Sequence, residues 1–259
     1  MPKKELYIPR SGRPFRLSRS KLDLFLECPR CFYLDRRIGV SRPSSPPLTL
    51  NTAVDGLLKK EFDACRRQGL QHPVQKQYAP DTRPARHPQI DDWRRNLAGV
   101  RFLHPGTNFL VFGAIDDLWQ NSDGRYHVVD YKATAKAEPV LSLDRAWHAG
   151  YKRQIEVYQW LLRKNGLDVS DRAYFLYCNG KVGQESFGGR LEFDLALIPY
   201  DASDAWVEDA LREAKACLDA DQMPESARNC EFCGYVRLSA QFIGQLAQGK
   251  TPWSSRVKE

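Results

Sequence analysis

Two apolar segments that carry acidic residues decide the fold. Residues 111–119 read VFGAIDDLW and residues 126–134 read YHVVDYKAT, with the turn-forming letters NSDG at 121–124 between them. β-Branched and aromatic residues on both sides of such a break are typical of a β-hairpin. We therefore expect an α/β core built on two antiparallel strands, the first within residues 108–119 and the second within 126–132.

The hairpin brings acidic side chains and a lysine together. Asp130 and Lys132 are two residues apart, so their side chains leave the same face of the sheet. Asp116 adds a carboxylate from the first strand; Asp117 is the adjacent alternative, but strand alternation turns it the opposite way. An ordinary surface ion pair would explain Asp130 and Lys132 alone, yet the apolar residues before Asp130 indicate a buried strand. Paired carboxylates beside a lysine suit a divalent metal with oxygen ligands.

Three motifs occur in a fixed order: GAID at 113–116, VVDYKAT at 128–134 and QIEVY at 154–158. This set resembles the PD-(D/E)xK nuclease superfamily, and most closely its RecB-type nucleases, which include nuclease domains of recombination helicases and CRISPR-adaptation exonucleases. The resemblance implies a restriction-endonuclease-like core, in which a central mixed sheet is flanked by helices. It also implies that Asp116 and Asp130 bind metal and that Lys132 is catalytic, with the Tyr131 carbonyl as a further ligand.

Gln154 and Tyr158 are one helical turn apart and share a helix face. A tyrosine on a core face with an incidental glutamine would give the same spacing. The resemblance instead places this pair beside the active site, in contact with catalytic groups or DNA.

Asp55 marks a departure from the family pattern. RecB-type nucleases usually carry a metal-binding histidine on the first core helix, and here Asp55 stands where that histidine is expected. A carboxylate is a hard ligand that suits Mg²⁺ or Mn²⁺, so Asp55 could replace the histidine. The alternative is that Asp55 is a solvated helix residue.

Four of the seven cysteines form two pairs, CPRC at 28–31 and CEFC at 230–233. Two such pairs in a cytosolic chain favour a metal site over disulfides. Related nucleases bind a [4Fe-4S] cluster through terminal cysteines, commonly one N-terminal and three C-terminal. The split here is two and two, which leaves tetrahedral Zn²⁺ as the alternative. We expect residues 17–35 and 220–240 to form this site through Cys28, Cys31, Cys230 and Cys233; Cys65, Cys178 and Cys217 are interpreted as buried or incidental residues.

The composition favours a polyanionic partner. The 259 residues predict a single nuclease domain, with a basic irregular arm at 1–16 and an insertion or connection at 72–97. Lys and Arg number 39 against 32 acids, a net charge of +7 that suits DNA. No apolar run approaches the ~18 residues of a membrane span, so we expect a cytoplasmic protein without membrane contact.

Hydrophobic periodicity and turn residues predict the remaining elements. Helices are expected after residue 18 or 20, from 49 or 51 to 69, at 90–97, 144–164 and 203–219. Further strands are expected at 101–103, 173–178 and 191–198, with a turn at 179–180 and irregular chain at 72–90.

The expected function is divalent-metal-dependent cleavage of DNA, exonuclease-like, in DNA repair, recombination or CRISPR and phage processes. Single-stranded or end-containing DNA is the expected substrate, and a helicase or a CRISPR or repair complex is an expected partner. Two alternatives are a catalytically inactive nucleic-acid-binding protein with the same fold and a zinc-stabilised interaction module. The intact set of Asp116, Asp130 and Lys132 favours the enzyme.

Overall fold

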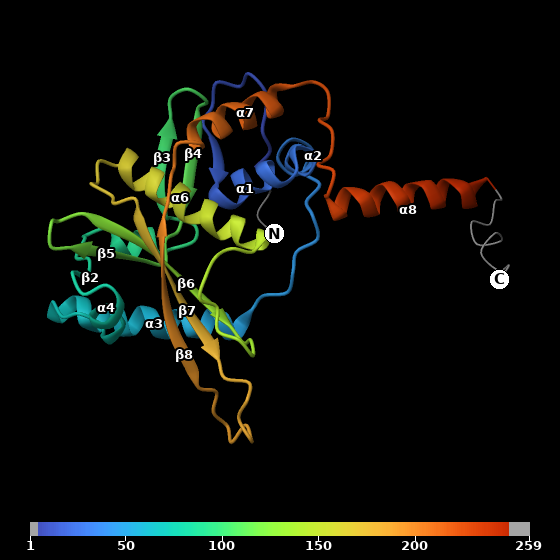
Figure 1. Cartoon of the computed structure of the whole chain (residues 1–259). Coiled ribbons are helices and arrows are strands. Elements are labelled where there is room, and N and C mark those ends of the chain that lie inside the picture. Colours follow the sequence, from blue (N-terminus) through green and yellow to red (C-terminus); the bar gives the residue numbers. More distant parts are fainter. Residues whose placement is uncertain (1–4, 249–259) are drawn as a thin grey trace. The chain divides into compact units, whose positions relative to one another are not determined.

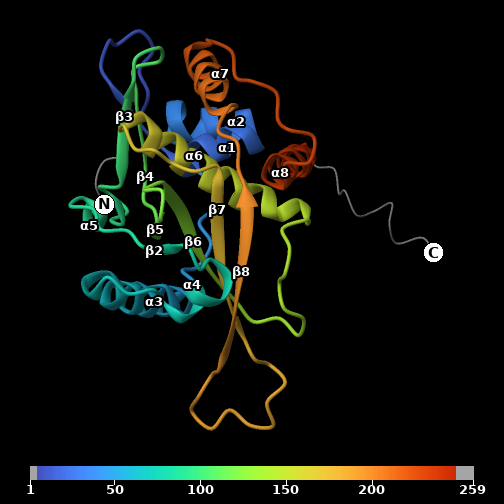
Figure 2. The same cartoon turned by 60° about the vertical axis from the view of Figure 1, so that its left-hand side comes forward.

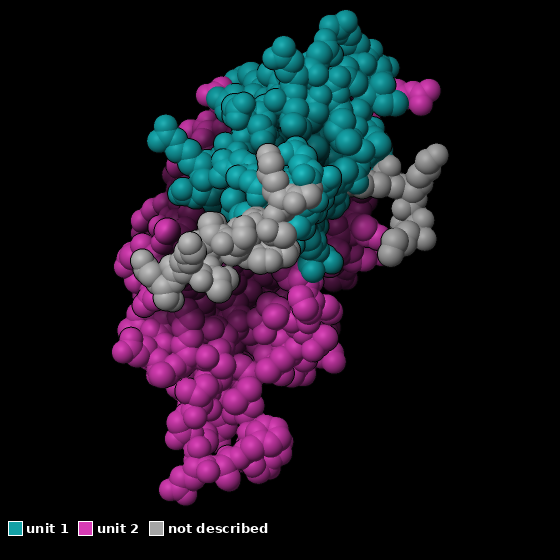
Figure 3. All heavy atoms as spheres, turned by 90° about the vertical axis from the view of Figure 1, so that its right-hand side faces the viewer, with its two compact units in different colours: residues 1–11, 24–44, 212–259 teal, residues 12–23, 45–211 magenta. Residues whose placement is uncertain are grey.

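The computed structural model describes residues 5–248 and divides into two compact units. Unit 1 consists of residues 1–11, 24–44 and 212–259, and unit 2 of residues 12–23 and 45–211 (Figure 3). Residues 1–4 of the expected basic arm lie outside the described residues. The arm's described part contains no helix, and the first strand begins at Phe15.

Unit 2 contains two β-sheets. A three-stranded sheet has the order β1-β4-β3, formed by Phe15–Ser18, Phe109–Gly113 and Val100–His104. A five-stranded sheet has the order β2-β5-β6-β7-β8, formed by Thr82–Pro84, Asp117–Asn121, Tyr126–Thr134, Arg172–Gly180 and Phe193–Asp201. β6 and β7 are parallel and the other pairs of the larger sheet are antiparallel, so this sheet is mixed, as expected.

Helices flank the larger sheet. From α3 (Thr49–Gln68), Leu58 and Phe62 pack into a core with Trp119 of β5 and Val129 of β6. α6 (Ala149–Lys164) follows the short helix η2 (Ala146–His148) and contacts β3, β4 and β6 (Figures 1 and 2). Two short helices complete the unit, α4 (Pro73–Tyr78) and α5 (Ile90–Trp93). The predicted α/β fold, a mixed sheet flanked by helices, is confirmed.

Unit 1 joins the two ends of the chain. It contains the end of α1 (Arg19–Glu27) and of α7 (Val207–Asp219), together with α2 (Pro29–Tyr33), η1 (Leu34–Ile38) and α8 (Glu231–Ala247). The Tyr7 hydroxyl donates to Asp219 Oδ1 at 2.6 Å, and Arg37 donates to the Leu218 carbonyl at 2.8 Å. Among the described helices, none is both long and apolar enough to cross a membrane.

The first expected strand differs from the prediction. Residues 108–119 form two strands, β4 and β5, separated by residues 114–116, and the two strands belong to different sheets. β4 pairs with β1 and β3, whereas β5 pairs with β2 and, as the predicted hairpin, with β6. The alternation pattern could not show this break, because it depends on partners distant in sequence.

Other boundaries also differ. The expected turn at Asn179-Gly180 is wrong: both residues lie in β7, where pairing with β8 continues to Gly180. The chain expected to be irregular at 72–90 contains α4 and β2. β2 is an edge strand, which explains how it accommodates Pro84. The helices expected from 144 and 203 begin as α-helices at Ala149 and Val207.

Candidate functional site

Asp130 and Lys132 extend from the same face of β6, as strand alternation predicts. The Asp130 side chain is fully buried, and the Lys132 ammonium forms an ion pair with its Oδ2 atom. Neither Asp130 oxygen has a hydrogen-bond partner among the described residues. A buried carboxylate without hydrogen bonds destabilises the folded state. A further positive charge beside Asp130, in addition to the Lys132 ammonium, would therefore stabilise it.

Asp116 lies in the connection between β4 and β5. Its Oδ2 atom accepts a hydrogen bond of 2.9 Å from the backbone N–H of Tyr131, which fixes the carboxylate beside β6. Burial and the negative charge of Asp130 raise the pKa of Asp116 to about 6, although Lys59 and Lys132 act in the opposite direction. The raised pKa indicates that the two carboxylates repel each other, and a bound cation would relieve this repulsion.

Asp117 points the opposite way, as expected. Its buried carboxylate accepts hydrogen bonds from Arg66, from Arg94 at 2.6 Å and from the Tyr131 hydroxyl at 2.8 Å. Asp63 also pairs with both arginines. Asp117 therefore belongs to a buried ion-pair network that connects α3 and α5 with the sheet, whereas Asp116 faces Asp130.

Asp55 lies on α3, near Asp116, since both acids pair with Lys59. Its side chain is 33 % exposed and forms an ion pair of 2.9 Å with Lys59, one helical turn later. Burial and then the charge of Asp116 raise the pKa of Asp55, although Lys59 opposes both effects. Asp55 and Lys132 both line a cavity of about 210 Å³ whose other walls include Asn51, Tyr131 and Tyr151.

Lys59 was not singled out from the sequence. Its ammonium lies 2.9 Å from Asp55 Oδ2 and 3.7 Å from Asp116 Oδ1, so it is shared by two acids. The four-residue spacing between Asp55 and Lys59 was a visible signal for an ion pair on one helix face. Its proximity to Asp116 was not visible, because it requires α3 to pack against the β4–β5 connection.

Gln154 and Tyr158 share a face of α6, as their spacing predicts. Gln154 Nε2 donates to the Tyr158 hydroxyl at 3.2 Å, and Gln154 Oε1 accepts from Lys132 Nζ at 3.5 Å. Burial raises the pKa of Tyr158 to about 12, so its hydroxyl stays protonated at neutral pH. The Tyr158 ring also explains the glycine of the GAID motif: a Cβ atom on Gly113 would lie 2.6 Å from Tyr158 Cε1.

A wide groove of about 960 Å³ adjoins these acids. Asp55, Lys59 and Asp116 line it together with Arg94 and Arg95. The groove is therefore lined by both basic side chains and carboxylates, a combination that suits a phosphate backbone beside a metal site.

The carboxylates fit a hard divalent cation, because Mg²⁺ and Mn²⁺ prefer oxygen ligands. Asp116 and Asp130 are the strongest candidates for holding it, on the evidence of the raised pKa of Asp116 and the Asp130 oxygens without hydrogen bonds. The carboxylate oxygens of Asp55, Asp116 and Asp130 do not form a group as tight as the cysteine sulfurs. Among the described residues, the four cysteines form the group of ligand atoms that all lie within 4.8 Å of one another.

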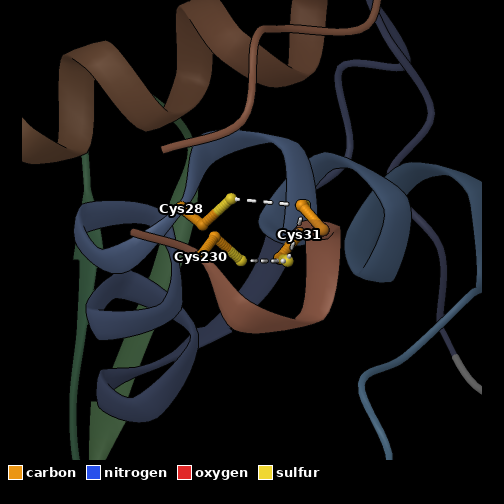
Figure 4. A group of neighbouring side chains, drawn as sticks. Cys28, Cys31 and Cys230 are labelled. Carbon is orange, nitrogen blue, oxygen red and sulfur yellow. Dashed lines mark hydrogen bonds between the residues drawn. The ribbon is translucent and has the colours of Figure 1, made fainter. Parts of the chain in front are cut away.

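The cysteine cluster consists of Cys28, Cys31, Cys230 and Cys233, all in unit 1. Cys28 and Cys31 begin α2, and Cys230 and Cys233 begin α8. Figure 4 shows Cys28, Cys31 and Cys230 gathered together. Their Sγ atoms approach those of the opposite pair to 3.5 Å for Cys31–Cys230, 3.6 Å for Cys31–Cys233 and 3.8 Å for Cys28–Cys233.

Cys28 differs in pKa from Cys31 and Cys233. Burial alone would raise the pKa of Cys28, but hydrogen bonds from the backbone of Cys31 and Ala227 and from Cys230 lower it to about 6. Burial raises the pKa of Cys31 and of Cys233. Arg42, which the sequence did not single out, lies with Nη2 3.6 Å from Cys230 Sγ. Thiolates are the form of cysteine that binds metal, so this environment fits a metal ion.

The fold is a mixed α/β sheet flanked by helices, with an acid-lysine cluster at its centre. A model of the PD-(D/E)XK nuclease superfamily matches residues 16–238, and the chain belongs to this superfamily. The superfamily predicted from the three motifs is thereby confirmed, whereas the RecB type stays a prediction.

Comparison with curated proteins gives no match. Comparison with solved structures gives matches that include the following two. SSO0001 is 14 % identical, with 90 % of this chain and 87 % of that chain covered and a TM-score of 0.42. A "Putative exonuclease" from Eubacterium rectale is 14 % identical, with 88 % and 90 % covered and a TM-score of 0.43.

Proposed function

We propose that this nuclease-superfamily protein is a divalent-metal-dependent deoxyribonuclease of the RecB type, exonuclease-like in action. One observation carries the proposal: the buried Asp130 carboxylate lies against Lys132 and repels Asp116, within the matched family region. DNA repair, recombination or CRISPR and phage processes are the settings that the RecB-type resemblance suggests, with a helicase or a CRISPR or repair complex as partner.

Asp116 and Asp130 would hold Mg²⁺ or Mn²⁺, with Asp55 and the Tyr131 carbonyl as further ligands. Such an ion lowers the pKa of water and stabilises the charge that develops on phosphate oxygens. Lys132 supplies a second positive charge beside Asp130, where it orients the attacking water. Gln154 accepts from Lys132 and donates to Tyr158, so this pair positions the lysine rather than transferring a proton.

The alternative functions remain a catalytically inactive DNA-binding protein and a metal-stabilised interaction module. Binding alone does not require a fully buried aspartate beside a lysine, because such a group destabilises the fold unless a partner compensates it. The acid-lysine site therefore supports the nuclease over both alternatives.

The cysteine cluster supports a structural metal in unit 1. A tetrahedral metal with Zn–S bonds of ~2.3 Å has sulfurs about 3.8 Å apart. The Sγ separations of 3.5, 3.6 and 3.8 Å agree with this spacing. The irons and sulfides of a [4Fe-4S] cluster stand between its thiolates, which must then lie further apart. We therefore propose Zn²⁺ over the cluster that the family resemblance suggests.

An assay with end-labelled single- and double-stranded DNA tests the nuclease. Cleavage is expected with Mg²⁺ or Mn²⁺ and not with EDTA. Asp130→Asn and Lys132→Ala should each reduce the rate at least ~100-fold, because each removes charge at the reacting phosphate. Cleavage by either variant at the wild-type rate, under matched metal concentration, would show that the site is wrong. Metal analysis after anaerobic purification distinguishes one equivalent of zinc from iron with acid-labile sulfide.

A further inference from the structure

Trp147 is an exposed aromatic side chain next to the candidate active site. It lies in η2, directly before α6, and 47 % of its surface is accessible. Its ring meets that of Tyr151 edge-on, with centroids 5.6 Å apart and an interplanar angle of 90°. Lys132 Nζ in turn lies 4.3 Å from the centroid of Tyr151. Trp147 and Tyr151, the aromatic pair, thus connect the surface with Lys132.

The surface around Trp147 is hollowed and rich in positive charge. A cavity of about 420 Å³, within the range of small-ligand sites, is formed by residues 136–142 with Arg145, Trp147 and His148. Lys136 and Arg145 supply two positive charges there against the single carboxylate of Glu138. Lys136 Nζ lies 4.5 Å from the centroid of the Trp147 ring, which holds the indole by a cation–π contact.

Each ring of the aromatic pair borders a different cavity. Trp147 lines the cavity of about 420 Å³, and Tyr151 lines the cavity of about 210 Å³ together with Lys132 and Asp55. A strand whose phosphate reaches Lys132 would therefore pass Trp147 with its adjacent nucleotide.

We propose that Trp147 stacks on an unpaired base beside the scissile phosphate. The proposal rests on the proposed nuclease function and names a residue that would position its substrate. In duplex DNA the face of each base is covered by its neighbours, whereas every unpaired base offers a π face to an aromatic ring. Lys136 and Arg145 line the same cavity as Trp147, where their positive charges would attract neighbouring phosphates.

The test measures binding of a fluorescent oligo(dT) and of a matched blunt duplex to the full chain in EDTA, where cleavage does not interfere. Stacking is worth about 1–3 kcal/mol per base, so Trp147→Ala should weaken single-strand binding roughly 5- to 150-fold. Trp147→Phe should retain most of the affinity. Tyr78→Ala is the matched control, because Tyr78 is 46 % exposed but lies on α4 and lines neither cavity.

A second readout separates charge from stacking. Lys136→Ala should reduce the slope of log K against log salt concentration by about 0.7, the value for one phosphate contact on a single strand. Trp147→Ala should leave this slope unchanged.

The outcomes distinguish this proposal from the nuclease function. Trp147→Ala with wild-type single-strand affinity, or with an equal loss on duplex DNA, overturns the stacking role. A wild-type chain that binds oligo(dT) no better than duplex overturns it as well. If Trp147-dependent binding is present but no divalent metal permits cleavage, the stacking role stands and the nuclease function fails.

Discussion

The carboxylate site and the cysteine cluster each hold several ionisable side chains close together, but they do so in different ways. At the carboxylate site the acids come from α3, the β4–β5 connection and β6, and each contacts a lysine of the chain itself. In the cysteine cluster four sulfurs face one another within 4.8 Å, with a single arginine beside them.

The difference follows from how strongly each type of side chain destabilises the folded state when several of them lie together. Burial first and then repulsion between the carboxylates raise the pKa of Asp55 and Asp116, and Lys59 and Lys132 oppose this by pairing with the acids. Burial favours the neutral thiol of Cys31 and Cys233 by raising their pKa, so these sulfurs lie together with less repulsion and can ionise when metal binds. The carboxylate site is partly exposed and carries charges of both signs, whereas the cysteine cluster resembles a closed structural site.

The largest effect should come from breaking the cysteine cluster. Structural zinc contributes on the order of 10–16 kcal/mol in small peptides, which is comparable with the ~5–15 kcal/mol by which whole domains are stable. Cys31→Ser should therefore release the metal and make unit 1 readily digestible, as measured by metal analysis and by limited proteolysis with mass spectrometry.

Cys65→Ser is the control, since Cys65 lies on α3 outside the cluster. Equal metal content and equal protease resistance in both variants would remove the cluster as a stabilising element.

Substitutions of the adjacent residues Asp116 and Asp117 should have different effects, one on activity and the other on stability. Asp117→Asn leaves Arg66 and Arg94 without their buried carboxylate partner, which should cost about 3–5 kcal/mol of unfolding free energy. Asp116→Asn should keep the fold and abolish cleavage. Urea unfolding and DNA cleavage, measured on both variants, check the contrast; a large stability loss in Asp116→Asn with activity retained would reverse the assignment.

The burial of Asp116 and its repulsion by Asp130 should make stability depend on pH. Because folding raises the pKa of Asp116 from 3.8 to about 6, its protonated form favours the folded state. This stabilisation is complete below about pH 4 and is lost as the pH rises through 6. In buffer without divalent cations, wild type should lose on the order of 1–3 kcal/mol relative to Asp116→Asn between pH 4 and 7. Urea titrations at each pH measure this, and a difference that does not vary with pH would contradict it.

The smallest effect is expected at Asp55, which is a third exposed and paired with Lys59. Asp55→Ala should weaken the Mg²⁺ dependence of cleavage by about 10-fold, the lower range for groups that support a metal site. Asp55→His should retain activity with a shift toward Mn²⁺, because imidazole is a softer ligand. Metal titrations that coincide for wild type and both variants would show that Asp55 only pairs with Lys59.

Local patterns predicted which side chains lie together at the candidate active site and some of the fold. The two-residue spacing of Asp130 and Lys132 and the four-residue spacing of Gln154 and Tyr158 each place a pair on one face, and both pairs are in contact. The hairpin between β5 and β6 was also predicted. These features depend on residues close in sequence, for which strand and helix periods are sufficient.

Apart from the cysteine cluster, which its two paired motifs predicted, several features that depend on distant partners were missed. The division of residues 108–119 between two sheets is decided by β1, β2 and β3, and the continuation of β7 through Asn179-Gly180 is decided by β8. Lys59 and Tyr151 join the carboxylate site because α3 and α6 pack beside β6.

The sequence by itself determined the family, the acid-lysine motif and the two cysteine pairs, because residue identity and short spacing are written along the chain. The sequence also predicted that the two cysteine pairs, some 200 residues apart, form one site, and the four sulfurs do lie together, with 3.5 Å between those of Cys31 and Cys230. Only the tertiary structure decided that Asp117 is held by Arg66 and Arg94 and that Lys59 is shared by Asp55 and Asp116. The physical reason is the same in both cases: contacts between distant segments depend on how helices and strands pack into a common core, and no local period encodes that packing.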